Sequence, residues 1–235
     1  MRGLFVTGTG TGVGKTVLSA ALLAAMAAEG ERVRAYKPVL TGLEDLPEAG
    51  GPGAWPPDHE LLAAAAGMAA EDVAPLRYGP AVSPHLAARL AGERIDPERL
   101  LAAARRAAID DGTLVVEGVG GLLVPLTDHY TVCDLAAALG LPVLIAAAAG
   151  LGTINHTLLT LEAARAAGLD VRAVVLTPWP EEPSELERSN LETIAHLGGV
   201  EVVGLGAVPG PDIAELARVG ASLPWRRWLE GDRVE

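Results

Sequence analysis

Short, uniformly apolar runs recur along the chain and alternate with longer segments in which alanine and leucine repeat at helical spacing. Continuous apolar runs are typical of strands buried on both faces of a parallel sheet, and the longer segments fit covering helices. Strands are predicted at 3–7, 33–40, 113–118, 141–149, 171–177 and 200–208, and helices at about 17–29, 84–92, 97–108, 153–167 and 184–197. The pattern predicts an α/β fold, a single domain over residues 1–235 with a mainly parallel central sheet and helices on both faces.

A stretch rich in glycine and proline, residues 40–58, follows the second predicted strand. We expect no regular structure there, and long loops inside compact domains usually carry function or are disordered. Two helix starts are clearer. Ser83 and Asp96 each stand before a proline, the arrangement of an N-cap residue followed by proline at the first helical position.

The charge balance argues against two classes of partner. Eighteen basic and thirty acidic side chains give a formal net charge of −12, which repels phosphate backbones and anionic bilayers over the general surface. Aromatic residues make up only 3% of the chain, too few for a platform that stacks single-stranded bases. We therefore expect no nucleic-acid and no membrane partner, and any polyanion must be bound locally.

The sequence also favours a cytoplasmic location. Cys133 is the only cysteine, so it cannot form an internal disulfide, and the N-terminus lacks the pattern of a signal peptide. The uncharged stretch 135–151 is interrupted by Gly140, Pro142 and Gly150, so its pieces are too short to span a bilayer. We expect a helix end, a turn and a buried strand in that stretch.

A glycine-rich segment, residues 8–16 (GTGTGVGKT), lies between the first predicted strand and the first predicted helix. A phosphate-binding loop requires this context, because backbone N–H groups and a helix N-terminus must face the anion. Lys15 would neutralise the β- and γ-phosphates of a nucleotide, and the Thr16 hydroxyl would bind Mg²⁺. Thr9 stands where the P-loop pattern expects its first glycine, yet the ending Gly-Lys-Thr still predicts a P-loop NTPase-like fold.

Two acidic residues are candidates for holding the metal. Glu117 lies near the carboxyl end of the strand predicted at 113–118, where ligands of open parallel sheets bind; an ordinary solvated acid is the alternative. Asp58 precedes a helical pattern, where an aspartate is most often an N-cap. From residue chemistry alone, the cap is the favoured role of Asp58 and a metal ligand is the alternative.

Lys37 is the second of only two lysines in the chain. It lies on a predicted strand near the glycine-rich loop, and the following Pro38 holds it in extended backbone. A solvated edge lysine is one interpretation. We favour a functional role, because a compact, flexible ammonium group suits a carboxylate-like or phosphoryl group as it forms.

Five ordered stretches resemble the dethiobiotin synthetase family, the ATP-dependent carboxylases of biotin biosynthesis. They are VTGTGTGVGKT (6–16), YKPVLTG (36–42), SPH (83–85), VVEGVGGLLVPL (115–126) and LGTINHTLLT (151–160). The resemblance implies a ligase that carboxylates one amine of 7,8-diaminononanoate with CO₂ and phosphorylates the carbamate with ATP to a carbamic-phosphoric anhydride. The second amine then closes the ureido ring, giving dethiobiotin, ADP and phosphate. Mg²⁺ is the implied cofactor and a homodimer the implied assembly.

The resemblance also implies roles for individual residues. Lys15 and Lys37 become catalytic, with Lys37 facing the carbamate and the γ-phosphate. Thr16, Asp58 and Glu117 become metal ligands, which reverses the preference for Asp58 as a cap. Nucleotide and metal contacts are implied for Gly12, Val13, Gly14, Lys15, Thr16, Val17, Asp58, Glu117, Gly118, Val119, Gly120, Thr177, Pro178, Val208, Pro209 and Gly210. Substrate contacts are implied for Thr11 and Thr41, and, for the carboxylate near the dimer interface, for Gly152, Thr153, Ile154 and Asn155.

The chain departs from the family pattern at the adenine edge. After the strand predicted at 171–177 the family commonly carries Asn-Asp, whereas this chain has Thr177-Pro178. A single hydroxyl there replaces the paired donor and acceptor groups of an amide. We therefore expect ATP to have only a weak advantage over other triphosphates.

Two other functions share parts of the pattern. A switch ATPase of the partitioning or septum-positioning type shares the deviant P-loop and uses ATP-dependent dimerisation, but such proteins usually carry an additional lysine where this chain has Gly10. A nucleotide or small-molecule kinase needs a lid of arginines, which we cannot locate in the sequence. The terminal segment 224–235 carries three acids among three arginines, so it is expected to be docked on the domain and not to anchor it in a membrane.

Overall fold

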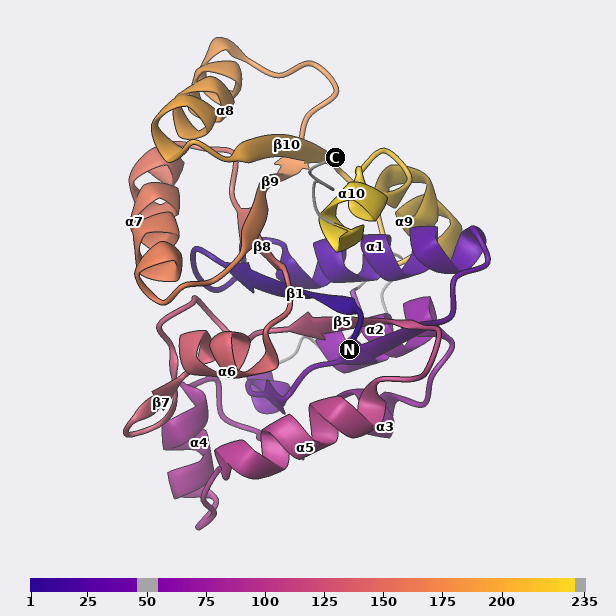
Figure 1. The fold of residues 1–235 in the computed structure, drawn as a ribbon, viewed down its shortest axis with the longest axis vertical. Helices are drawn as coiled ribbons and strands as arrows, with labels where there is room; N and C mark the ends of the chain where they lie inside the picture. Colours follow the sequence, from indigo (N-terminus) through magenta and orange to yellow (C-terminus); the bar gives the residue numbers. More distant parts are fainter. Residues whose placement is uncertain (46–54, 231–235) are drawn as a thin grey trace.

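The computed structural model describes residues 1–45 and 55–230, and within them six strands form one parallel sheet (Figure 1). In sheet order they are β10 (Glu201–Gly206), β9 (Val171–Trp179), β8 (Val143–Ala147), β1 (Gly3–Gly8), β5 (Thr113–Glu117) and β2 (Val33–Tyr36). Each neighbouring pair is parallel, because the connections between these strands cross over through helices. The predicted α/β fold with a parallel central sheet is confirmed.

Helices cover both faces of the sheet, and alternate strand residues supply the two halves of the core. Leu4 and Val6 of β1 pack on one side and Phe5 on the other. The first side is covered by α1 (Lys15–Ala28), α2 (Asp58–Ala66), α3 (Ala70–Val73), α9 (Ile213–Gly220) and α10 (Trp225–Glu230). The second is covered by α4 (Pro84–Leu90), α5 (Pro97–Ala107), α6 (Val132–Leu139), α7 (Thr153–Ala166) and α8 (Glu185–Gly198).

The prediction of one continuous strand over residues 33–40 is wrong in its second half. The central-sheet strand β2 ends at Tyr36, and Val39–Leu40 forms a separate strand, β3, paired with β4 (Leu76–Arg77). Pro38 has no N–H to continue the ladder, and the Lys37 N–H donates to the Val73 carbonyl at 2.8 Å. The break leaves Lys37 at the carboxyl end of β2.

Several elements were not predicted from the apolar pattern, or were predicted with other bounds. The loop at 40–58, expected without regular structure, contains the 3₁₀ turn η1 (Leu43–Asp45), and residues 46–54 lie outside the described ranges. A hairpin of β6 (Pro125–Thr127) and β7 (Tyr130–Thr131) follows β5. The strands predicted at 171–177 and 200–208 run instead over 171–179 and 201–206. Helices α3 and α9 were not predicted either.

The two proline-marked helix starts are confirmed in position. The Asp96 side chain caps α5 by accepting a hydrogen bond from the Glu98 N–H, whereas the Ser83 side chain makes no such bond. The docking predicted for the terminal segment holds for its described part, because Trp225 and Trp228 of α10 are buried. Among the described residues, no helix combines the length and hydrophobicity that a membrane crossing requires.

Candidate active site

The glycine-rich loop leaves the carboxyl end of β1 and turns directly into α1. Gly12 and Gly14 have φ angles of 74° and 86°, a region that only glycine adopts without strain. Gly14 is the N-cap residue of α1, so the unpaired N–H groups of the first helical turn lie at the loop, as anion binding requires. Lys15 is buried, and its Nζ donates a hydrogen bond to the Gly10 carbonyl at 2.8 Å.

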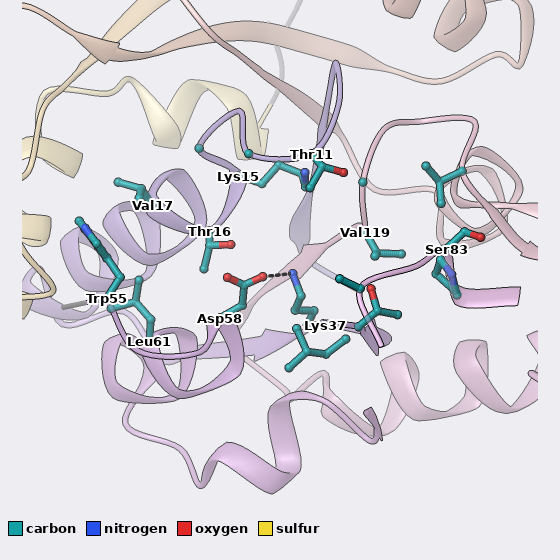
Figure 2. Close-up of a pocket in the computed structure, with 18 of the residues that line it drawn as sticks. Thr11, Lys15, Thr16, Val17, Lys37, Trp55, Asp58, Leu61, Ser83 and Val119 are labelled. Carbon is teal, nitrogen blue, oxygen red and sulfur yellow. Dashed lines mark ion pairs between the residues drawn. The ribbon is translucent and has the colours of Figure 1, made fainter. Parts of the chain in front are cut away.

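A cavity of about 820 Å³ lies beside this loop (Figure 2). The loop and the start of α1 form one wall, the segment after β2 and the start of α2 form the floor, and two further loops close the other side. The lining residues are Thr11, Gly12, Gly14, Lys15, Thr16, Val17, Lys37, Leu40, Thr41, Trp55, Pro56, Asp58, Leu61, Ala81, Val82, Ser83, Pro84, Val119, Gly120 and Val124.

Four polar side chains from separate elements meet at the base of this cavity. Lys37 Nζ lies 2.5 Å from Glu117 Oε1 and 2.8 Å from Asp58 Oδ2. The Thr16 hydroxyl donates to the same Glu117 oxygen at 2.9 Å. The side chains of Lys37 and Glu117 are only 3% and 1% exposed, whereas that of Asp58 is 41% exposed. The lysine is thus a buried cation between two carboxylates, not a solvated edge residue.

The two lysines experience different environments. Burial alone would lower the pKa of Lys37, but Glu117 and Asp58 together outweigh it, and the pKa is raised above its ordinary value. Burial is also the largest influence on Lys15; there it prevails over the attraction of Glu117, and the pKa is lowered. The charged form of Lys37 is therefore favoured, whereas within residues 1–45 and 55–230 the Lys15 ammonium forms no ion pair with a carboxylate.

The residues predicted to bind Mg²⁺ do converge. Thr16, Asp58 and Glu117 offer hydroxyl and carboxylate oxygens, the hard ligands that Mg²⁺ prefers. Glu117 Oε2 is buried and has no hydrogen-bond partner among the described residues, so an acceptor oxygen is left free for a cation. In residues 1–45 and 55–230 no group of three or more His, Cys, Asp or Glu side chains is arranged to hold a metal. Two carboxylates and a hydroxyl suit Mg²⁺, whose other ligands are usually phosphate and water oxygens.

The cap role that residue chemistry favoured for Asp58 is wrong. Pro57 occupies the N-cap position of α2, and no side chain caps that helix. Asp58 is the first helical residue, and its carboxylate turns to Lys37 instead. Burial alone would raise the pKa of Asp58, but the charge and the hydrogen bond of Lys37 outweigh it, and the pKa is lowered.

The cavity gathers only part of the predicted site. The predicted residues that line it or touch its base are Thr11, Gly12, Gly14, Lys15, Thr16, Val17, Lys37, Thr41, Asp58, Glu117, Val119 and Gly120. Those outside its lining are Val13, Gly118, Gly152, Thr153, Ile154, Asn155, Thr177, Pro178, Val208, Pro209 and Gly210. Their roles stay predictions.

Two of the outlying groups have informative positions. Thr177 is buried against the P-loop: a Cβ on Gly14 would lie 2.5 Å from its Cγ2. Gly152 and Asn155 are exposed at the start of α7, beside Leu151, whose surface is 92% exposed. The first group therefore borders the glycine-rich loop, whereas in the second Gly152 and Asn155 face outward and Thr153 is buried.

An apolar wall of the cavity was missed by the sequence reasoning. Leu40, Val82 and Val124 line it, and Ser83, treated only as a helix cap and as part of a family block, also faces the cavity (Figure 2). Single apolar residues in loops carry no sequence signal of a ligand. Only the resemblance of the SPH block pointed to this segment.

Comparisons with known proteins identify the family of the chain. A family model described as an AAA domain matches residues 2–213. An ATP-dependent dethiobiotin synthetase of Anaeromyxobacter dehalogenans is 45% identical over 93% of this chain and 95% of its own length. The chain belongs to the dethiobiotin synthetase family. Dethiobiotin synthetases of Rhodococcus jostii and Bacillus subtilis are 40% and 36% identical, over 97% and 87% of this chain and 96% and 87% of their own lengths.

The family resemblance seen in the five sequence blocks is thereby confirmed. The fold of this dethiobiotin synthetase family member is also similar to that of apo McdA from Cyanthece, with a TM-score of 0.51 over 93% of this chain and 90% of that chain. The sequence identity to McdA is 11%, so the similarity concerns the fold alone.

Proposed function

We propose that the chain is an ATP- and Mg²⁺-dependent dethiobiotin synthetase, which carboxylates 7,8-diaminononanoate with CO₂ and closes the ureido ring, releasing dethiobiotin, ADP and phosphate. One observation carries the proposal beyond family membership. Both lysines of an otherwise lysine-free chain line a single cavity, one on the P-loop and one among carboxylates. A triphosphate and a carbamate are both anions, and the reaction has to bring them together.

The P-loop would bind the triphosphate. The N–H groups at the start of α1 supply donors, and Lys15 exchanges its hydrogen bond with the Gly10 carbonyl for the β- and γ-phosphates. The partner of Lys15 in the described part of the chain is a neutral carbonyl, which is exchanged at low cost because a charged acceptor makes a stronger hydrogen bond.

Lys37 would face the reacting end of the diamine. Its ammonium group lies at the base of the cavity, opposite the P-loop wall, where it would stabilise the carbamate and the charge that develops during phosphoryl transfer. Thr16, Asp58 and Glu117 would hold Mg²⁺, which when bound offsets the negative charge of the phosphates. No general base is needed where the second amine attacks in its neutral form.

The remaining wall would hold the aliphatic part of the substrate. The wall has apolar surface from Leu40, Val82, Val119 and Val124. Hydroxyl groups lie among these side chains, from Thr11, Thr41 and Ser83. Such a wall suits a hydrocarbon chain that carries two amines at one end.

The substrate carboxylate would be bound at the start of α7 by Gly152, Thr153, Ile154 and Asn155 in a homodimer. Leu151, just before α7, and Leu159 within it are 92% and 61% exposed, apolar surface that a second copy would cover. These residues lie outside the cavity lining, which is consistent with a site completed by a second copy. The cytoplasmic location inferred from the lone Cys133 stays part of the same proposal.

The test is product formation. Protein incubated with ATP, Mg²⁺, bicarbonate and 7,8-diaminononanoate should yield dethiobiotin by mass spectrometry, with ADP release that depends on the diamine. ATP turnover that is independent of the diamine, with no dethiobiotin, would favour the switch ATPase and contradict the proposal.

A further inference from the structure

Lys37 occupies the place where the proposed metal ligands meet. Its Nζ lies 2.5 Å from Glu117 Oε1 and 2.8 Å from Asp58 Oδ2. The third proposed ligand, the Thr16 hydroxyl, donates a hydrogen bond to that same Glu117 oxygen. Glu117 Oε1 and Asp58 Oδ2 are therefore paired with the ammonium, whereas Glu117 Oε2 has no hydrogen-bond partner among the described residues.

A divalent cation bound to Glu117 Oε2 and to Asp58 would share both carboxylates with the ammonium of Lys37. The lone pairs of Glu117 Oε1 already accept hydrogen bonds from Lys37 and Thr16, and two cations in contact with the same carboxylate repel each other strongly in a buried site. When both Glu117 and Asp58 bind the metal, the ammonium has to be elsewhere.

We infer that Lys37 is a built-in counter-ion that holds the divalent-cation position in the metal-free protein and swings out toward the substrate when the cation is bound. The inference rests on the proposed metal site and assigns a second role to Lys37. Its ammonium neutralises Glu117 and Asp58 while no cation is bound, and its release couples metal binding to delivery of the catalytic charge.

The local structure allows the side chain to move while the backbone stays. The Lys37 N–H is bonded to the Val73 carbonyl at 2.8 Å, and Pro38 fixes the next backbone angle. The four-carbon stem of lysine is flexible, and Lys37 lines the cavity of about 820 Å³ together with Thr41 and Ser83. Rotation about side-chain bonds is therefore enough to carry the ammonium from the carboxylates into the cavity.

The ammonium compensates the charge of two carboxylates that lie together at the base of the cavity. With Lys37 in place, a free divalent cation must displace a well-paired ammonium. A nucleotide shifts the balance, because its phosphates supply further ligands to the cation and a new partner for the released lysine. Metal binding should therefore be weak without nucleotide.

Binding of Mn²⁺ alone, without nucleotide, tests the inference. Free Mn²⁺ is measured by electron paramagnetic resonance during titration of the wild type, Lys37→Met and Lys15→Met. Lys37→Met should bind Mn²⁺ at least about tenfold more tightly than the wild type, a change of roughly 1.4 kcal/mol. Lys15→Met is the matched control, because it removes the same charge from the same cavity but from a lysine bonded to the Gly10 carbonyl. It should change the affinity by less than about threefold.

Equal Mn²⁺ affinity of the wild type and Lys37→Met would overturn the inference. So would an equal gain in both lysine variants, because only overall charge would then matter. Dethiobiotin formation by the wild type is scored separately. If product forms but Lys37→Met gains no affinity, the counter-ion role fails and the proposed function stands. If the affinity is gained but no product forms, the proposed function fails alone.

A second measurement uses the wild type, in case Lys37→Met does not fold. Because the chain has two lysines, ¹³C-lysine labelling gives two Cε–Hε signal sets, which Lys15→Arg assigns. Nucleotide added together with a chelator should shift the Lys15 signals and leave the Lys37 signals nearly unchanged. Mg²⁺ added afterwards, in excess of the chelator, should shift the Lys37 signals. Lys37 signals that do not respond to Mg²⁺ would contradict the swing.

Discussion

At the scale of single residues, the two lysines of the cavity are predicted to have different roles, Lys15 in nucleotide binding and Lys37 in catalysis. Lys15 is bonded to its own loop and Lys37 to two carboxylates. Lys37→Gln should lower kcat at least about 100-fold, the usual effect of losing one transition-state donor, and leave the dissociation constant for ATP nearly unchanged. Lys15→Gln should impair both. Steady-state kinetics and calorimetric titration with ATP measure the two quantities, and identical profiles would contradict separate roles.

Glu117 is also predicted to be the main structural partner of Lys37. Glu117→Gln removes the closer carboxylate of a buried pair, and the free energy of unfolding should fall by about 3 kcal/mol, as for other broken buried pairs. Asp58→Asn is the control, because Asp58 is 41% exposed and its loss should cost about 1 kcal/mol or less. Urea unfolding measures both. An equal loss in the two variants would show that burial does not set the strength of the pair.

We predict that the site recognises the nucleotide base only weakly. Thr177 packs against the P-loop residue Gly14 and offers one hydroxyl where the family resemblance implies an amide. ATP, GTP and CTP should therefore have dissociation constants within about tenfold of one another. Competition titrations with Mg²⁺ present decide this. A preference for ATP by several orders of magnitude would mean that other groups read the base.

At the scale of elements, the helix that carries Lys15 is held by an unusually close helix contact. A Cβ added to Gly220 of α9 would lie 2.1 Å from the Ala21 carbonyl oxygen of α1. Gly220→Ala should therefore lower the free energy of unfolding by about 1–3 kcal/mol through overpacking. Gly206→Ala is the control, because its Cβ would meet its nearest atom at 3.8 Å and should change stability by no more than about 0.5 kcal/mol. Equal values from denaturant unfolding would contradict a tight α1–α9 contact.

The elements predicted well were those with one strong, local signal. Continuous apolar runs gave the strands of the central sheet, and the glycines before Lys15 gave the loop and the start of α1. The break at Lys37–Pro38 was missed, because the hydrogen bond that ends β2 goes to Val73, a partner distant in sequence. The hairpin β6–β7 and the helix α9 were missed because they are short. The two strands contain three and two residues, and α9 contains eight.

The candidate site was predictable where its residues are close in sequence and not where the fold brings distant residues together. The P-loop residues follow from local pattern, whereas the pairing of Lys37 with Glu117 and Asp58 depends on the fold bringing three segments together. Local chemistry alone assigned Asp58 to a helix cap; only the family resemblance pointed to the cluster. The apolar wall at Leu40, Val82 and Val124 could not be predicted, because isolated apolar residues in loops are common on any surface.

At the scale of the whole molecule, the fold brings both lysines of an acidic chain to one edge of the sheet. The parallel sheet directs the ends of β1, β2 and β5 to one edge, where the helix dipole of α1 and both lysines act against a net charge of −12. Binding of a triphosphate and a carbamate should thus be confined to this edge.

The deciding measurement follows a label from bicarbonate into the product. The protein is incubated with ¹³C-bicarbonate, ATP, Mg²⁺ and 7,8-diaminononanoate, and the products are analysed by mass spectrometry while ADP is counted. Dethiobiotin carrying the label in its ureido carbonyl, with one ADP formed for each molecule, is the expected result. ADP formation without labelled dethiobiotin would contradict the carboxylase function.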